Sequence, residues 1–166
     1  MQARYLYCMK HDNIALDEAD RRLLRALQRD ASVSQAELAE AAGVSPSLVS
    51  RRIARLKEVG VLRAVVGLVD AKSAGLTCAA IIRVRLRDHS AENVRAFRDV
   101  VQRMEEATLC VMLTGEADYL VKIVARDLPH FQEIVQGKLL RCKAIAHMES
   151  SIVLEYLKDT TELPLG

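Results

Sequence analysis

The chain has 166 residues, of which 51% are hydrophobic and 28% are charged, so it is long enough for one domain or two small ones and too apolar to be disordered. Its formal net charge is only +2, because 24 basic residues are balanced by 22 acidic ones. The total charge therefore excludes no class of partner, and any contact with nucleic acid has to come from a local cluster of basic side chains.

The sequence argues against a membrane protein and against disulfides. No apolar run approaches the roughly 18 residues of a membrane span, and the first 13 residues lack the apolar core of a signal peptide. The four cysteines are far apart, at positions 8, 78, 110 and 142. Neither C-x-x-C nor a cysteine and histidine cluster with zinc spacing occurs. We expect a cytoplasmic protein with reduced thiols, no bound metal and no cofactor.

The first 15 residues show no clean period and are predicted to form an N-terminal arm, although their aromatic residues could instead dock on a partner. A helix is predicted to begin after Asp17, which can cap it, and to carry Asp20 in its first turn. Its apolar stripe consists of Leu23, Leu24 and Leu27.

Two further helices are predicted close behind the first. Ser34-Gln-Ala-Glu37 is a capping box, and Gly43 ends the helix that follows it. The next helix begins at Ser45 and Pro46: the serine can accept a hydrogen bond from a free backbone N–H group, and proline at the first helical position loses none. A short capped helix, a glycine turn and a second helix predict a helix-turn-helix over residues 16–62.

The third of these helices has one apolar side and one basic side. Val49, Ile53 and Leu56 form the apolar stripe, which must pack against the other helices. The opposite side is small, polar and cationic: Ser47, Ser50, Arg51, Ala54 and Arg55. Such a surface suits the major groove of double-stranded DNA, where arginine can bind guanine or phosphate. A helical protein-interaction module is the alternative interpretation.

The second half of the chain follows a different pattern. Residues 63–76 are predicted to be an extended wing or linker. Cys78 to Arg87 alternates between apolar and basic residues, which predicts a strand with one buried face. A helix after Ser90, strands over 109–114 and 119–125, a helix after Asp127 with Leu128 inside, and a strand over 148–157 complete the order βαββαβ.

That order predicts a ferredoxin-like domain over residues 77–157, followed by a tail over residues 158–166. The fold class is therefore α+β. Two helices cover one face of the predicted sheet, and the other face still carries Val121, Ile123 or their neighbours. Because this second face is too apolar to stay in water, we expect it to meet another copy of the chain.

The sequence shows no catalytic motif, since it lacks a glycine-rich phosphate loop, G-x-S-x-G and H-E-x-x-H, and its four histidines are scattered. The segment Thr114-Gly-Glu-Ala-Asp118-Tyr119 has two interpretations. It is a tight turn in which Gly115 adopts a positive φ and Asp118 accepts turn N–H groups, or its amides and carboxylate hold a small zwitterion at a subunit edge.

Taken together, LDEADRRLLRALQRDA, SQAELAEAAGVSPSLVSRRIARLKEVGVL, TGEADYLVKI and the closing VLEYLKDTTELPL resemble the Lrp/AsnC (feast/famine) family of prokaryotic transcription regulators. The resemblance covers residues 16–165. It implies an N-terminal winged helix-turn-helix, a C-terminal domain that dimerises through its sheet and often builds octamers, and amino-acid effectors bound between those domains.

The resemblance also implies functional positions. DNA contacts would fall on Ser45, Ser47, Ser50, Arg51, Arg52 and Arg55. Effector binding would fall on Met112, Gly115, Asp118, Leu128, Ser151, Ile152 and Val153. The sequence departs from the family at its Gly-Glu-Ala-Asp hairpin, where Gly-Asp-aromatic-Asp is usual, at Ser151, where an aromatic residue can occur, and at Lys143-Ala144, which replaces a Pro-Gly turn.

Two other functions compete with an amino-acid-responsive regulator. Sirohaem decarboxylases share this architecture, and His147, Arg141 and Lys143 are the candidates for such a tetrapyrrole enzyme. The intact basic helix over residues 46–58 argues against that function. An effector-sensing module that no longer binds DNA would require a neutral helix at the same place, which this sequence does not have.

Overall fold

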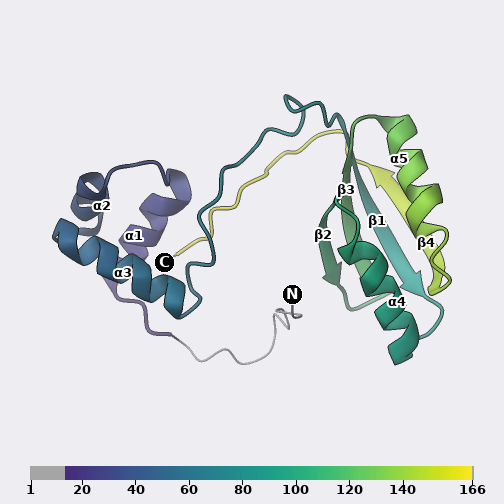
Figure 1. Ribbon diagram of the computed structural model, residues 1–166, viewed down its shortest axis with the longest axis horizontal. Helices are drawn as coiled ribbons and strands as arrows, with labels where there is room; N and C mark the ends of the chain where they lie inside the picture. The colour runs from purple at the N-terminus through teal and green to yellow at the C-terminus, as the bar shows by residue number, and fades with distance from the viewer. Residues whose placement is uncertain (1–13, 166) are drawn as a thin grey trace. The chain divides into compact units, whose positions relative to one another are not determined.

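The computed structural model describes residues 14–165, which form two compact units (Figure 1). One unit contains the described residues up to Gly67 together with those from Asp159 onward, and the other runs from Leu68 to Lys158. Most of the predicted N-terminal arm, with Cys8, lies outside the described residues.

The first unit is built from three helices: α1 (Glu18–Arg29), α2 (Gln35–Ala42) and α3 (Pro46–Glu58). Their buried apolar side chains form one small core, made of Leu23, Leu24, Leu38, Ala39, Ala42, Val49 and Leu56. Alanine on α2 lets the backbones approach closely, so the second helix can pack against both of its neighbours. This arrangement confirms the predicted helix-turn-helix.

Two of the three predicted N-terminal caps of these helices are confirmed. Asp17 and Ser34 cap α1 and α2 through reciprocal hydrogen bonds with the third helical residue, as capping boxes do. Gly43 ends α2 in the left-handed conformation, with φ of 68°. The prediction for Ser45 was wrong, because its side chain caps no backbone N–H group; the Ser45 Oγ atom lies 3.1 Å from that of Ser47 instead.

The second unit has the element order β1 (Cys78–Leu86), α4 (Ala91–Gln102), β2 (Ala107–Met112), β3 (Tyr119–Ala125), α5 (Leu128–Ile134), a short π-helix η1 (Val135–Leu139) and β4 (Ile145–Ile152). The four strands form one antiparallel sheet in the order β2-β3-β1-β4. This order is that of the predicted ferredoxin-like split βαβ fold.

Alternation along the strands decides which side chains the two helices cover. On β1, Ala80, Ile82 and Val84 are fully buried and share one core with Phe97 of α4 and Phe131 of α5. Both helices therefore cover the same face of the sheet (Figure 1).

The opposite face of the sheet is open and partly apolar. Val121 and Ile123, which were expected there, do not belong to it. Val121 and Ile123 are fully buried under the helices, because they pair with Ile82 and Ala80 and so point to the covered side. Their neighbours form the open apolar face, namely Ile81, Leu109, Val111, Leu120 and Val124.

Three further expectations need correction. The last strand, predicted over 148–157, begins at Ile145 and ends at Ile152. Leu128, expected inside, is 50% exposed because it occupies the first turn of α5. Residues 63–76 contain no strand, so the predicted wing is not paired in a sheet.

The C-terminal segment belongs to the helical unit, which sequence reasoning had not foreseen. The Gln28 side chain at the end of α1 accepts a hydrogen bond from the Leu163 N–H group at 2.7 Å and donates one to the Leu163 carbonyl at 3.3 Å. Leu165 packs against the three-helix core, and Arg29 pairs with Glu162 at 3.2 Å. The chain thus returns to the helical unit after leaving the sheet.

Candidate DNA interface and effector region

Helix α3 buries apolar side chains on one side and exposes mainly polar side chains on the other. Val49 and Leu56 are fully buried against α1 and α2, whereas Ser47, Ser50 and Arg51 are exposed. Ser50 donates a hydrogen bond to the Gln35 side chain of α2 at 3.1 Å, which links the two helices of the motif. The two small serines leave the helix narrow on the side that would enter a DNA groove.

The three arginines of α3 differ in what they contact. Arg52 donates hydrogen bonds to Asp17 at 2.7 Å and to Asp20 at 2.8 Å, and Arg55 donates to the second oxygen of Asp20. Arg51 forms no hydrogen bond or ion pair with any residue that the structure describes. Its guanidinium is therefore the one that is ready to bind an external acceptor without breaking an internal contact.

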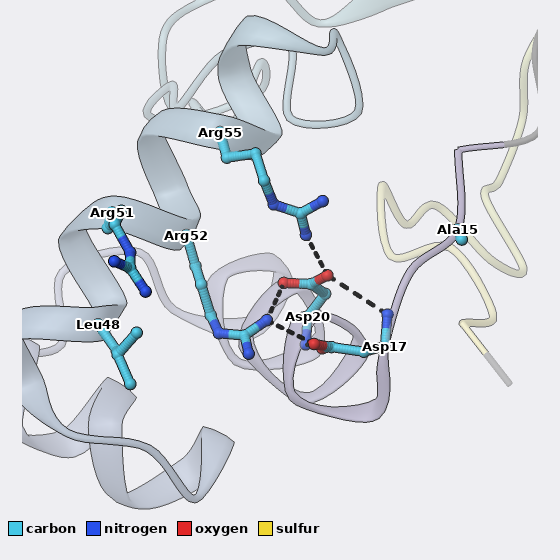
Figure 2. A pocket seen from close by; sticks show the side chains of 7 residues that line it. All are labelled: Ala15, Asp17, Asp20, Leu48, Arg51, Arg52 and Arg55. Atoms are coloured by element: carbon cyan, nitrogen blue, oxygen red, sulfur yellow. Dashed lines mark hydrogen bonds and ion pairs between the residues drawn. The ribbon is translucent and has the colours of Figure 1, made fainter.

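These side chains surround a pocket of about 380 Å³ between α1 and α3 (Figure 2). Its lining consists of Ala15, Asp17, Asp20, Leu48, Arg51, Arg52 and Arg55. Five of these seven residues are charged, two acidic and three basic, and four of the five belong to the ion pairs that join α1 to α3.

The Asp17 carboxylate is held in its ionised form. The backbone N–H group of Asp20, followed by the Arg52 guanidinium, lowers the pKa of Asp17 below its ordinary value. Hydrogen bonds to Asp17 and Asp20 in turn raise the pKa of Arg52. The contact between Asp17 and Arg52 therefore joins two charged groups throughout the physiological pH range.

Sequence reasoning placed Asp20 in the first turn of α1 and missed its contact with α3. A signal was present, because Asp20 precedes Leu23, Leu24 and Leu27 by three, four and seven residues. This spacing puts the carboxylate on the buried stripe of the helix. Arg52 occupies the same kind of position on α3, three residues after Val49 and four before Leu56.

The seven positions that the resemblance implies for an effector form two groups within one chain. Met112, Gly115 and Asp118 lie where β2 ends and β3 begins, near Val84 and Leu86 of β1. Ser151, Ile152 and Val153 lie beside the opposite end of β1, which they reach through pairing with Ile81, Ala80 and Ala79. Leu128 follows β3 at this same end.

The two groups are separated by most of the length of β1, which is on the order of 20 Å for six residue steps in a strand. They also lie toward opposite edges of the sheet, since β2 and β4 are its edge strands. One copy of the chain therefore does not bring all seven positions to one small ligand.

The hairpin turn itself has a clear structural role. Gly115 has a φ of 115°, in the region that favours glycine. The Asp118 carboxylate accepts the Leu86 N–H group at 2.7 Å and contacts His89 Nε2 at 2.8 Å. Partial burial raises the pKa of Asp118, but these hydrogen bonds outweigh it and hold the pKa below its ordinary value. Asp118 thus ties the hairpin to the end of β1, rather than to the turn N–H groups.

The residues considered for a tetrapyrrole enzyme do not form a buried site. His147 is exposed on β4, and Arg141 and Lys143 are exposed just before that strand. Within residues 14–165, no three His, Cys, Asp or Glu side chains are grouped as metal ligands. In the same part of the chain, no helix is both long enough and apolar enough to cross a membrane.

Comparison with known proteins identifies both units. Residues 16–63 match the winged helix-turn-helix DNA-binding domain, and residues 79–163 match the Lrp/AsnC ligand binding domain. The fold and these matches define a DNA-binding transcription regulator with an effector-type domain. The chain belongs to the Lrp/AsnC family.

Relatives and solved structures agree with this assignment along almost the whole chain. The transcriptional regulator AzlB of Bacillus subtilis is 33% identical over 92% of this chain and 97% of its own length. The DNA-binding transcriptional activator DecR of Escherichia coli is 32% identical over 90% and 99%. The transcriptional regulator NMB0573 of Neisseria meningitidis, solved as an L-Met complex, superposes with a TM-score of 0.86 at 34% identity, covering 91% of this chain and 97% of that one. All three are named as transcription regulators, and none is named as an enzyme.

Proposed function

We propose that this regulator reads pseudo-palindromic DNA as a dimer or a larger assembly, and that an amino acid bound between its C-terminal units tunes that assembly. The observation that carries the first part is the exposed side of α3, where the Arg51 guanidinium lies among small polar residues and has no partner within residues 14–165. The second part is supported by the open apolar sheet face and by the separation of the effector positions.

The DNA contacts are proposed for Ser45, Ser47, Ser50 and Arg51, which lie at the exposed N-terminal part of α3. Residues at the start of a recognition helix are the ones that reach base edges in the major groove. Arg52 and Arg55 are proposed to support this surface from the side that faces α1. One such helix spans few base pairs, so two copies a helical turn apart are needed to read a longer two-fold site.

The dimer is proposed to form through the open face of the sheet. Leu109 and Val111 on the edge strand are 44% and 36% exposed, and Ile81, Leu120 and Val124 continue the apolar area beside them. Burying this face against a second copy removes apolar surface from water on both sides of a two-fold axis. An octamer is the assembly that we expect dimers of this kind to build.

The effector is proposed to be a small amino acid that contacts two copies of the chain. Gly115 and its neighbours would be supplied by one copy, and the segment 151–153 with Leu128 by another. The solved complex of the Neisseria regulator contains L-Met, so L-methionine is the first candidate. A ligand of this kind shifts an equilibrium between assemblies only by its different affinities for them.

The DNA-binding part is tested by mapping the sites that the regulator occupies across its genome and measuring its affinity for one of them. Arg51→Ala should weaken specific binding by about 1–3 kcal/mol if Arg51 reads a base. Arg95→Ala, which removes an exposed arginine from α4 instead, is the matched control and should leave affinity unchanged. Equal affinity of the Arg51 variant and the wild type would remove Arg51 from the contacts.

The effector part is tested by light scattering of the full chain with a panel of amino acids that includes L-methionine. We expect at least a dimer without ligand and a change of assembly with one member of the panel. A monomer would refute the proposed sheet interface. An assembly that is indifferent to every amino acid would refute the proposed effector class while leaving the DNA-binding function intact.

A further inference from the structure

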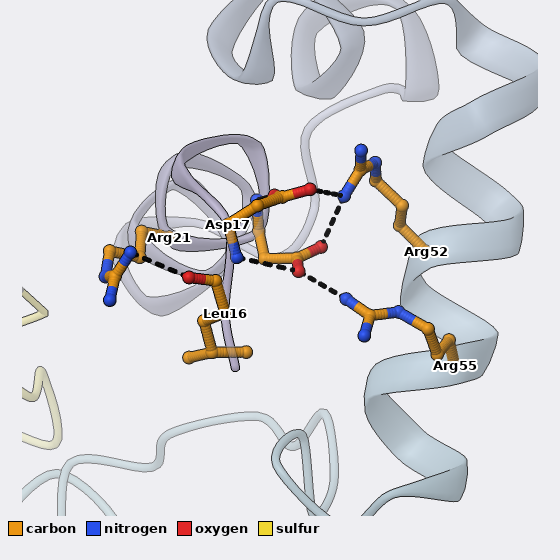
Figure 3. A network of polar contacts seen from close by, with 6 residues as sticks. Leu16, Asp17, Arg21, Arg52 and Arg55 are labelled. Carbon is orange, nitrogen blue, oxygen red and sulfur yellow. Dashed lines mark hydrogen bonds and ion pairs between the residues drawn. The ribbon is translucent and has the colours of Figure 1, made fainter. Parts of the chain in front are cut away.

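Asp20 is the one charged side chain that is fully buried among the residues that the structure describes, with 1% exposure. It lies in the first turn of α1, beneath α3. Its two oxygens have different partners: one accepts from Arg52, and the other accepts from Arg55 and from the Asp17 N–H group at 3.3 Å (Figure 2). Figure 3 shows the Arg52 and Arg55 side chains extending from α3 toward Asp17 at the start of α1.

The burial of this carboxylate is tolerated only because these partners stabilise it. An ionised group that is removed from water is strongly unfavourable unless opposite charges and hydrogen bonds replace its hydration. Both opposite charges come from α3, one turn apart, so the buried carboxylate favours one position of α3 along α1. A shift of α3 by one residue would take at least one guanidinium away from Asp20.

The same contacts decide how much positive charge α3 offers to DNA. Arg52 is the less exposed of the two arginines, at 23% of its side chain, and it also contacts Asp17; Arg55 is 42% exposed. The charges of Asp17 and Asp20 thus offset those of Arg52 and Arg55. The third arginine of the helix, Arg51, has no acidic partner in the described part of the chain.

From this geometry we infer that Asp20 is a positioning residue for DNA recognition, which fixes α3 and withholds Arg52 and Arg55 from phosphate groups. The inference rests on the proposed function, because it concerns the same helix. Withholding two cations lowers the affinity for any duplex, since non-specific binding is mainly electrostatic. The specific site loses less, because Arg51 and the serines act through direct contacts. Asp20 thereby increases the ratio of specific to non-specific affinity.

The salt dependence of DNA binding measures this directly, because log K falls with log salt by about 0.9 for each phosphate that is neutralised. Asp20→Asn removes the buried charge at nearly constant shape. With a duplex of random sequence as the probe, we expect a slope steeper by about 0.9 to 1.8, tighter non-specific binding and a smaller specificity ratio. Glu18→Gln is the matched control: it removes the same charge from α1, where Glu18 pairs with Arg22 and Arg25 at the surface, and should leave the slope unchanged.

A purely structural role for Asp20 would weaken specific and random duplexes together without making the slope steeper, and that result would overturn the inference. In the double variant Asp20→Asn with Arg55→Gln, the salt slope should lie closer to the wild-type value than in Asp20→Asn alone, because the charge that Asp20→Asn releases on Arg55 is then absent.

Two single variants decide the matter even if Asp20→Asn does not fold. On the random duplex, where Arg51 has no specific base to read and binds phosphate instead, we expect Arg55→Gln to leave the salt slope unchanged and Arg51→Gln to reduce it by about 0.9. A reduction of that size in the Arg55 variant would show that Arg55 binds phosphate, and would overturn the inference. Failure of the wild type to bind any duplex would instead overturn the proposed function, so the two failures are distinguishable.

Discussion

The two units of this regulator are stabilised by different kinds of contact. The sheet unit has a large apolar core that includes the rings of Phe97 and Tyr119. No charged side chain of this unit is buried. The helical unit has a small core of leucine, valine and alanine and adds a buried carboxylate, two arginines and the C-terminal tail. A small domain buries less of its surface, so it depends more on specific polar contacts to fix its helices. The helical unit should therefore be the more sensitive of the two to loss of single polar contacts.

The largest effect is expected from the apolar core of the sheet unit. Phe97→Ala should destabilise that unit by about 3–5 kcal/mol, because it leaves a cavity beside Tyr119, whose ring centroid lies 4.6 Å from that of Phe97. Hydrogen exchange followed by mass spectrometry reports on each unit separately and checks this. Arg98→Ala, at an exposed position next to Phe97 on α4, is the control and should change little. A similar loss of protection in α1 to α3 would show that the units do not have separate cores.

The next effect tests the tail of the helical unit. Removing residues 159–166 deletes the two hydrogen bonds of Gln28, the pair of Arg29 with Glu162 and the packing of Leu165. We expect a loss of about 1–3 kcal/mol from the helical unit alone, since each such hydrogen bond contributes about 1 kcal/mol and surface pairs contribute less. The same exchange measurement applies.

Two single substitutions divide the contribution of the tail. Gln28→Ala should reproduce much of the loss, whereas Glu162→Ala should reproduce little, because it breaks only an exposed ion pair. Unchanged protection of α1 after removal of the tail would refute the role given to that segment.

A smaller effect concerns acid. Burial raises the pKa of Glu106, but the hydrogen bonds from Lys138 at 2.7 and 2.8 Å outweigh it and lower the pKa below its ordinary value. A carboxyl whose pKa is lowered by folding contributes stability that is present above its unfolded pKa and is lost as the pH falls through its folded pKa. We therefore expect the sheet unit to lose on the order of 1 kcal/mol from this pair as the pH falls below about 4.

Glu106→Gln should remove that part of the pH dependence, as measured by denaturant unfolding followed through tyrosine fluorescence. Asp159→Asn, outside the sheet unit, serves as the comparison. An unchanged acid profile in the Glu106 variant would mean that the pair with Lys138 does not stabilise the folded state.

The smallest effect is expected at Tyr119. Its hydroxyl is buried and has no hydrogen-bond partner among the described residues. Tyr119→Phe keeps the ring contact with Phe97 and removes an unsatisfied polar group, so stability should be unchanged or rise by up to about 1 kcal/mol. Tyr156→Phe, at a 46% exposed position, is the control in a thermal unfolding experiment. A loss greater than about 1 kcal/mol would show that the hydroxyl has a partner.

Local signals explain why much of the architecture could be predicted. A capping box joins residues three apart, so Asp17 and Ser34 identified the starts of α1 and α2 correctly. Strand alternation is equally local, and it gave the buried side of β1 and the limits of β3 without reference to any other element. The order βαββαβ then followed from reading these elements along the chain, and that order is typical of the ferredoxin-like fold.

The sequence by itself therefore determined the two types of domain and the basic side of α3, since each depends on the spacing of residues along a single helix or strand. The tertiary structure alone decided which arginine of α3 lacks an acidic partner in the described part of the chain, because the partners of Arg52 and Arg55 lie 32 to 35 positions away, at the start of α1. It also decided the place of the tail, where Gln28 meets a residue 135 positions later. Periodicity places Asp20 and Arg52 on the buried sides of their helices, but it does not say which residues pair, because pairing depends on how separate elements pack together.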